Sequence, residues 1–214
     1  MTQRRYRQAA GAGLAVFVAL ASASCGDAVR QGRSPAYLVI DNLKAAPGAE
    51  PDKLAHTLDS DVVTNVKVTQ GSETYMVPTF FEDRGELEAH IAMKDVGPEL
   101  SPTDPSENNM ITVTRYHVRF IRADGRNTPG VDVPYAFDGA ATGTFGPGVS
   151  TLSFVLVRAQ AKSEAPLLAM RGMGGAQLIS TIAEVTFYGK DQAGNAVSAT
   201  GQMSVNFADW GDPE

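Results

Sequence analysis

Cysteine, tryptophan and histidine are scarce in this sequence, and their scarcity limits the chemistry of the chain. One cysteine, one tryptophan and three histidines occur among 214 residues. A single cysteine cannot form an internal disulfide. The histidines at positions 56, 90 and 117 have neither the spacing nor the Cys or His partners that are typical of zinc ligands. We therefore expect no disulfide framework, no metal centre and no cofactor.

Sequence motifs of catalytic sites are missing as well. There is no Gly-x-Ser-x-Gly turn and no phosphate-binding loop of the Walker type. The segment Gly172-Met-Gly174 precedes an apolar strand pattern instead of following one, so it does not match a dinucleotide fingerprint. The sequence favours a protein that is not an enzyme. A hydrolase that uses two loop carboxylates is the less favoured alternative, and it needs two such groups facing one cleft.

Acidic residues gather in one turn-rich segment without a calcium-binding spacing. Asp124, Asp132 and Asp138 lie close together in the sequence, and Asp191 begins another turn. Calcium takes several oxygen ligands at short range, but this spacing does not match an EF-hand. We interpret these aspartates as turn residues that bond to nearby backbone groups, with calcium binding as the alternative.

The chain has more acids than bases, and this argues against some partners. Its 24 acidic and 18 basic residues give a formal net charge of −6. The first 24 residues contain three arginines and no acid, so their removal would move the net charge from −6 to about −9. A chain of this charge is a poor candidate for nucleic acid or an anionic membrane surface.

The amino terminus has the pattern of an export signal. Arg4, Arg5 and Arg7 precede an apolar run from Ala9 to Ala21, and small residues follow through Ala23. The apolar run is shorter than a transmembrane helix requires. Residues 1–24 are therefore predicted to be an export signal, with a retained membrane anchor as the alternative.

The only cysteine follows this segment directly. The stretch Leu20-Ala-Ser-Ala-Ser-Cys25-Gly resembles a bacterial lipoprotein signal. The resemblance implies that Cys25 becomes a lipidated first residue and that residues 25–34 form a tether to the cell envelope. The alternative is cleavage after Ala23, which would release a soluble periplasmic or secreted protein. Membrane contact is expected only through the lipid.

The clearest fold signal is a hairpin pattern from Leu178 to Phe207. Apolar residues alternate with polar ones on both sides of Asp191-Gln-Ala-Gly-Asn195. Such alternation around a short Gly-Asn loop predicts two antiparallel strands with one buried face. That face must be covered by a second sheet.

Further strand patterns extend this interpretation to the whole chain. Strands are expected at 36–40, 86–94, 111–122, 150–160, 176–188 and 196–207, with short ones around 131–137. No long amphipathic helix pattern occurs, although Pro51 to Leu58 is consistent with a helix start or an irregular crossing. These features predict an all-β fold, an antiparallel β-sandwich of about seven strands. Residues 35–210 would form this single domain, with an irregular insertion at 41–85 and a tail at 211–214.

Two strands resemble those of known sandwich families. The segment Val185-Thr-Phe-Tyr-Gly-Lys-Asp-Gln-Ala-Gly-Asn195 resembles the penultimate strand and turn of bacterial immunoglobulin-like domains, where Asp-x-Ala-Gly-Asn recurs. Tyr116-His-Val-Arg-Phe120 is similar to the central strand of fibronectin type III domains. The resemblance covers about a third of the chain and implies an immunoglobulin-like sandwich.

A basic stripe is the first candidate binding surface. Arg115, His117 and Arg119 alternate along the polar side of the strand at 111–122. They are interpreted as a solvated strand face paired with acids such as Glu86 and Glu88. The alternative is a contact surface for an acidic glycan or a protein.

Four aromatic residues form the second candidate surface. Tyr135 and Phe137 lie in the turn-rich segment, and Phe80 and Phe81 precede the acidic turn at Glu82. Such residues either close the open end of a sandwich or present a stacking surface to a sugar. Closing the end is the more common use.

Connectivity predicts where a binding site would lie. With alternate antiparallel strands, the segments 41–85, 123–149 and 161–175 would gather at one end, opposite the loops 95–109 and 191–195. Binding residues are concentrated in long loops on a rigid scaffold. The sequence thus predicts a non-catalytic envelope lipoprotein that binds an envelope protein or has a structural role. A carbohydrate-binding or adhesion module is the alternative.

Overall fold

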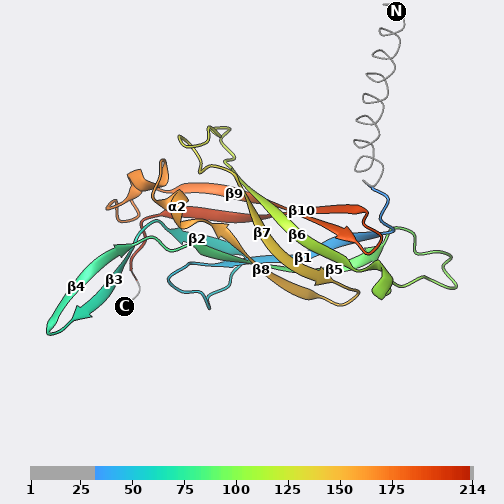
Figure 1. Ribbon diagram of the computed structural model, residues 1–214. Helices are drawn as coiled ribbons and strands as arrows, with labels where there is room; N and C mark the ends of the chain where they lie inside the picture. Colours follow the sequence, from blue (N-terminus) through green and yellow to red (C-terminus); the bar gives the residue numbers. More distant parts are fainter. Residues whose placement is uncertain (1–31, 213–214) are drawn as a thin grey trace, which may run out of the picture.

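The computed structural model describes residues 32–212, and most of this part of the chain is β-strand (Figure 1). The fold is all-β, as predicted. Short helical turns occur at η1 (Glu107–Asn109), α2 (Ala159–Lys162) and η2 (Leu167–Met170). The strands are β1 (Ala36–Ala46), β2 (Thr57–Asp61), β3 (Thr64–Gln70), β4 (Glu73–Thr79), β5 (Asp83–Met93), β6 (Ile111–Ile121), β7 (Phe137–Phe145), β8 (Ser150–Val157), β9 (Ile179–Asp191) and β10 (Ala196–Ala208).

The strands are arranged in three sheets. One sheet has five strands in the order β2-β10-β9-β6-β7, and another has three in the order β1-β5-β8. Neighbouring strands are antiparallel except for β2, which runs parallel to the end of β10. Within the described residues, β3 and β4 pair only with each other and form a ribbon that projects from the larger sheets (Figure 1).

One apolar core joins the inner faces of the two larger sheets. The ring centroid of Phe154, in β8, lies 5.2 Å from those of Tyr116 and Phe187, which belong to the other sheet. The Tyr116 hydroxyl oxygen also accepts a hydrogen bond from the Val155 backbone N–H at 3.1 Å. Phe187 is fully buried. The strands predicted at 111–122, 150–160 and 178–207 are found as β6, β8 and the β9–β10 hairpin, except that β8 ends at Val157 and a helical turn begins at Ala159.

The β9–β10 hairpin has the turn that its sequence predicts. The Asp191 carboxylate accepts hydrogen bonds from the backbone N–H groups of Ala193 and Asn195 at 3.0 and 2.8 Å. Gly194 has a φ of 81°, a conformation that glycine adopts without the steric cost of a side chain. The bonds of the aspartate to the turn fix the register of the longest hairpin in the described chain.

The segment 41–85 is more regular than predicted. β1 continues past the polar pair Asp41-Asn42 because a register shift there returns Leu43 and Ala45 to the core. The helix considered at Pro51 to Leu58 is wrong. Residues 57–61 form β2 instead, since Leu58 and Ser60 are buried beside the end of β10.

β7 replaces the short strands expected around 131–137. That region is a loop with one bridge between Pro129 and Val133, and the strand begins only at Phe137. β7 has few large apolar residues because it packs closely on bulky neighbours. A Cβ on Gly139 would lie 2.2 Å from Cζ of Tyr116, so glycine is needed at this position.

The connections divide between two ends of the sheets. Register places the end of β6 beside the start of β9, and the start of β9 beside the end of β10. We call this the loop end; it carries residues 47–56, 122–136 and 158–178 and the β3–β4 ribbon. The opposite, entry end carries residues 32–35, 94–110, 146–149 and 192–195 (Figure 1). The predicted clustering is thus found, except that 146–149 lies at the entry end because β7 runs back.

The predictions for the amino-terminal segment lie outside the described residues. They concern the export signal at 1–24, the lipidated Cys25 and most of the tether. Among residues 32–212, no helix has the length and apolar character needed to cross a membrane.

Candidate functional site

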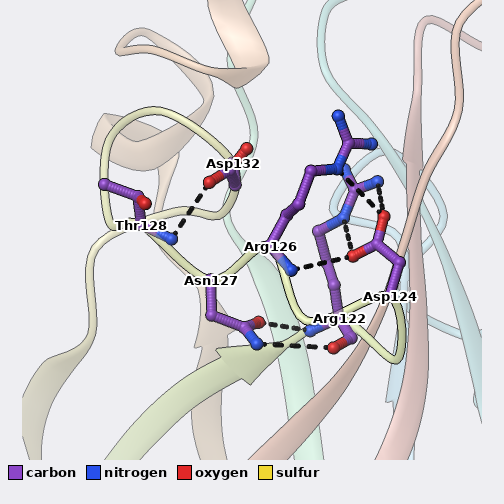
Figure 2. A network of polar contacts seen from close by, with 6 residues as sticks. All are labelled: Arg122, Asp124, Arg126, Asn127, Thr128 and Asp132. Carbon is purple, nitrogen blue, oxygen red and sulfur yellow. Dashed lines mark hydrogen bonds and ion pairs between the residues drawn. The ribbon is translucent and has the colours of Figure 1, made fainter.

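The loop at 122–136, at the loop end, is ordered by many hydrogen bonds between its own residues. Figure 2 shows a polar network around its first turn. Arg122 donates from Nε and Nη2 to the two carboxylate oxygens of Asp124 at 3.1 and 2.6 Å. The backbone N–H and Nε of Arg126 donate to the same carboxylate, both at 3.1 Å. The hydrogen bond from Arg122, with those from Arg126, holds the pKa of Asp124 well below its usual range.

Hydrogen bonds from backbone N–H groups hold the rest of this loop. The Asn127 side-chain oxygen accepts the Arg122 N–H at 2.7 Å, and Asp132 accepts the Thr128 N–H at 3.2 Å (Figure 2). The Thr128 carbonyl accepts N–H groups from residues 131 and 132 at 3.1 and 2.8 Å. A loop with its polar groups paired in this way loses little conformational entropy when it binds a partner.

Two large side chains project from this ordered loop. Tyr135 is 51% exposed and Val131 is 66% exposed. The Tyr135 ring lies against Gly130, where an added Cβ would come within 2.3 Å of the tyrosine hydroxyl oxygen. Gly130 also has a φ of 75°. The glycine therefore serves both the turn and the close approach of the ring, which fixes the position of Tyr135.

The segment 158–178 presents more apolar surface at the same end. Leu167 and Met170 are buried and hold the segment against the core. Leu168, Met173 and Leu178 are exposed. Exposed apolar surface is typical of interaction sites, and this segment adds three such side chains to the end that carries Tyr135.

A buried charge pair joins the segments of the loop end. The Lys162 ammonium donates to Asp83 at 2.8 Å, and the two side chains are 1% and 0% exposed. Ser60 Oγ and the Gly48 backbone N–H also donate to this carboxylate, at 2.5 and 2.8 Å. Burial raises the pKa of Asp83 above its ordinary value, although Lys162 and Ser60 lower it. Because both charges are sealed from solvent, their role is to fix the loop end.

The four predicted aromatic residues do not share one surface. Phe137 is only 8% exposed. The centre of its ring lies 6.2 Å from the centre of the Tyr116 ring and 4.4 Å from the Arg158 guanidinium carbon, so Phe137 belongs to the core. Phe80 and Phe81 are half-buried, and Phe81 lines a groove of about 630 Å³ beside the ribbon. Of the four, only Tyr135 is largely exposed. Phe137 is therefore withdrawn from the candidate surface.

The basic stripe lies on the outer face of β6, with partners other than those predicted. Arg115 and His117 lie 3.4 and 3.3 Å from Asp138 of β7, and Arg119 lies 2.6 Å from Glu184 of β9. Glu86 and Glu88 belong to β5 in the other sheet, where Glu88 pairs with Lys44. The stripe is paired with acids, as predicted, but the acids were misidentified because strand order was unknown.

The turn aspartates bond to neighbouring protein groups. Asp124 is bound by two arginines, Asp132 by a backbone N–H and Asp191 by its own turn. Within residues 32–212, no group of three or more His, Cys, Asp or Glu side chains is placed to hold a metal ion.

Comparison of the chain with known protein families, with curated proteins and with solved structures finds no match.

Proposed function

We propose that this protein is a non-catalytic binding domain of the bacterial cell envelope, anchored through a lipid on Cys25. It binds a partner protein with its loop end. The observation that carries the proposal is the ordered loop at 122–136, which holds Tyr135 and Val131 exposed at the end of the molecule that also exposes Leu168, Met173 and Leu178.

Strand order supports an immunoglobulin-like sandwich as the scaffold. In such domains, strands A, B and E lie in one sheet and strands C, F and G in the other. Here β1, β5 and β8 correspond to the first group, and β6, β9 and β10 to the second. The chain departs from this pattern in the β3–β4 ribbon and in the absence of the inter-sheet disulfide.

The chemistry of the loop end favours a protein over a glycan. Rigid tyrosine and apolar side chains on ordered loops supply contact area at a low entropic cost. A sugar platform uses several exposed aromatic rings, and only Tyr135 of the four candidate aromatics is largely exposed. Carbohydrate binding is therefore the weaker alternative.

Geometry at the two carboxyl groups of raised pKa also disfavours the hydrolase alternative. A glycosidase needs a carboxyl group of raised pKa that faces its substrate. Burial raises the pKa of Asp83, but this side chain is sealed from solvent and hydrogen-bonded on both oxygens. Burial also raises the pKa of Asp61, whose two oxygens accept hydrogen bonds from the Trp210 backbone N–H at 2.9 Å and the Thr64 hydroxyl at 2.6 Å.

Photo-crosslinking in intact cells tests the proposal. A benzoylphenylalanine at position 135 or 131 should give one discrete crosslinked species in which mass spectrometry finds peptides of a partner protein. The same residue at position 149 is the matched control, because Val149 is 62% exposed but lies at the entry end. A species of equal yield from position 149, or none from 131 and 135, would rule out binding at the loop end. A species that contains no partner peptides and loses its added mass on glycosidase treatment would favour the carbohydrate alternative.

A further inference from the structure

A pocket at the entry end is built on an irregularity in β6. Between Val113 and Arg115 the strand has one more residue than β9 opposite it, so Thr114 and Arg115 are both exposed. Gly189 of β9 makes this bulge fit, because a Cβ there would lie 2.4 Å from the Thr112 carbonyl oxygen. Bulges of this kind redirect side chains and are frequent beside binding sites.

The pocket is cationic although the chain is acidic. Its volume is about 780 Å³, and its lining includes Lys94, Arg115 and Lys190 but no aspartate or glutamate. Tyr37 and Tyr188 complete its walls with hydroxyl-bearing Thr114. The electrostatic potential in this pocket is therefore positive, although the net charge of the chain is −6.

Two of the cations are held in place mainly by neutral groups. The Lys94 ammonium donates to the Gly32 carbonyl at 3.0 Å and lies 5.2 Å from the centre of the Tyr37 ring. The Arg115 guanidinium lies 4.2 Å from the centre of the Tyr188 ring. Aromatic faces stabilise a cation without neutralising it, so neither ring cancels the charge that lies against it.

The acids near the pocket leave much of this charge unpaired. Asp138 contacts Arg115 at 3.4 Å, and it also lies 3.3 Å from His117. Asp191 directs its oxygens to N–H groups of its own turn. Within the described chain, Lys94 and Lys190 take part in no ion pair.

We propose that this pocket binds a phosphate group. Three cationic side chains and Thr114 line this one pocket, and they supply the donors that a phosphate with several acceptor oxygens requires. The site stands on its own geometry and is independent of partner binding at the loop end. The net charge of the chain predicts poor binding of anionic partners. This pocket is a local exception, because its charge is positive and that of the whole chain is negative.

The position of the pocket indicates two sources for the phosphate. Gly32 borders the pocket and is the seventh residue after Cys25. Seven extended residues span at most about 25 Å, so a lipid on Cys25 would keep the pocket near the membrane surface. An anionic lipid headgroup and a soluble phosphate ester share the chemistry that the pocket recognises, and experiment can separate them.

The test uses the mature chain, residues 25–214, with Cys25→Ala so that no lipid masks weaker contacts. The pocket variant is Lys94→Gln with Lys190→Gln. The control variant is Lys53→Gln with Lys67→Gln, which removes the same charge from exposed lysines elsewhere. A melting transition in chloride shows that each of the three chains is folded. If the double pocket variant does not fold, Lys190→Gln alone replaces it.

The first arm compares melting temperatures in inorganic phosphate and in chloride at equal ionic strength. Phosphate should raise the melting temperature of the parent and control chains more than that of the pocket variant. The general salting effect of phosphate acts on all three chains alike, so the difference between them reports the pocket.

The second arm measures sedimentation with vesicles of phosphatidylcholine, with and without phosphatidylglycerol. If a headgroup is the ligand, the parent binds only the anionic vesicles, and the pocket variant binds them roughly 30-fold more weakly. Pocket-dependent binding in either arm supports the phosphate site and identifies its source. The proposal is overturned if neither arm shows pocket dependence, or if the control variant loses as much binding as the pocket variant.

Discussion

Lys162 is the residue whose loss should destabilise the loop end most. It is the only cation in contact with the buried Asp83 carboxylate among the described residues, and both side chains are sealed from water. Removing one partner of such a pair leaves an uncompensated buried charge, whereas replacing both partners by apolar residues is often neutral. We therefore expect Lys162→Met to lower the free energy of unfolding by about 3–5 kcal/mol.

The pH dependence of that variant has a defined sign. Burial already raises the folded pKa of Asp83 above the unfolded value, and losing Lys162 raises it further. The unfolded chain then releases the Asp83 proton more readily, so stability falls as pH rises above about 4. Denaturant unfolding at about pH 5 and pH 8 should show a steeper fall for Lys162→Met than for wild type. The double variant with Asp83→Leu should remove this difference; equal stability of Lys162→Met and wild type would contradict the argument.

Individual side chains of the site were predictable only in part. The exposed Tyr135 and the stripe at Arg115, His117 and Arg119 could be recognised because turn residues and strand alternation are local signals. The bond between Asp83 and Lys162 could not, since 79 residues separate the partners. Neither residue stands out in its local sequence. The core position of Phe137 likewise depends on Tyr116 and Arg158, which reach it from other segments.

At the scale of elements, the β9–β10 turn should depend on Asp191. Its carboxylate accepts two backbone N–H groups and the Asn195 side chain at 2.9 Å. Asp191→Ala should cost about 2 kcal/mol, the usual size for hydrogen bonds to a charged group. Asp124→Ala is the contrast, because its carboxylate is at the exposed surface of a loop, and it should change stability less. The free energy of unfolding in denaturant measures both.

The contribution of Asp191 to stability should also depend on pH in the acid range. Burial alone would raise the pKa of Asp191, but hydrogen bonds from Asn195 and Ala193 bring it below its ordinary value. The folded pKa then lies below the unfolded value of about 3.9, so this stabilisation is present above about pH 4 and is lost as pH falls through the folded pKa. Wild type should lose more stability than Asp191→Ala between about pH 5 and pH 3. Parallel acid profiles would show that the carboxylate does not hold the turn.

Strands were predictable where their sequence alternates and unpredictable where partners impose them. β9 and β10 bury alternate residues along most of their length, so the sequence pattern was sufficient. β7 consists largely of glycine, alanine and threonine, and its two glycines fit closely against Tyr116 and Leu152. β2 is five residues long and exists through its parallel pairing with β10. Such strands carry little local signal because their stability comes from neighbours that are distant in the sequence.

At the scale of the whole molecule, the two ends differ in chemistry. The loop end exposes tyrosine, valine, leucine and methionine on an ordered backbone, and the entry end holds the cationic pocket beside Gly32. A lipid on Cys25 would place the cationic end toward the membrane and the apolar loops away from it. This polarity links the two proposals, because one anchor would orient both surfaces.

The anchor itself is tested by Cys25→Ala. If Cys25 carries the lipid, this change should move the protein from the membrane fraction to the soluble fraction. The melting temperature should stay the same, because Cys25 precedes the strands and the core described at residues 36–208. Mass spectrometry of the wild-type amino terminus provides the independent readout, with an acylated Cys25 as the expected result. An unmodified chain that begins at Ser24, with the same fractionation for both proteins, would show that cleavage follows Ala23 and that neither end is held at a membrane by lipid.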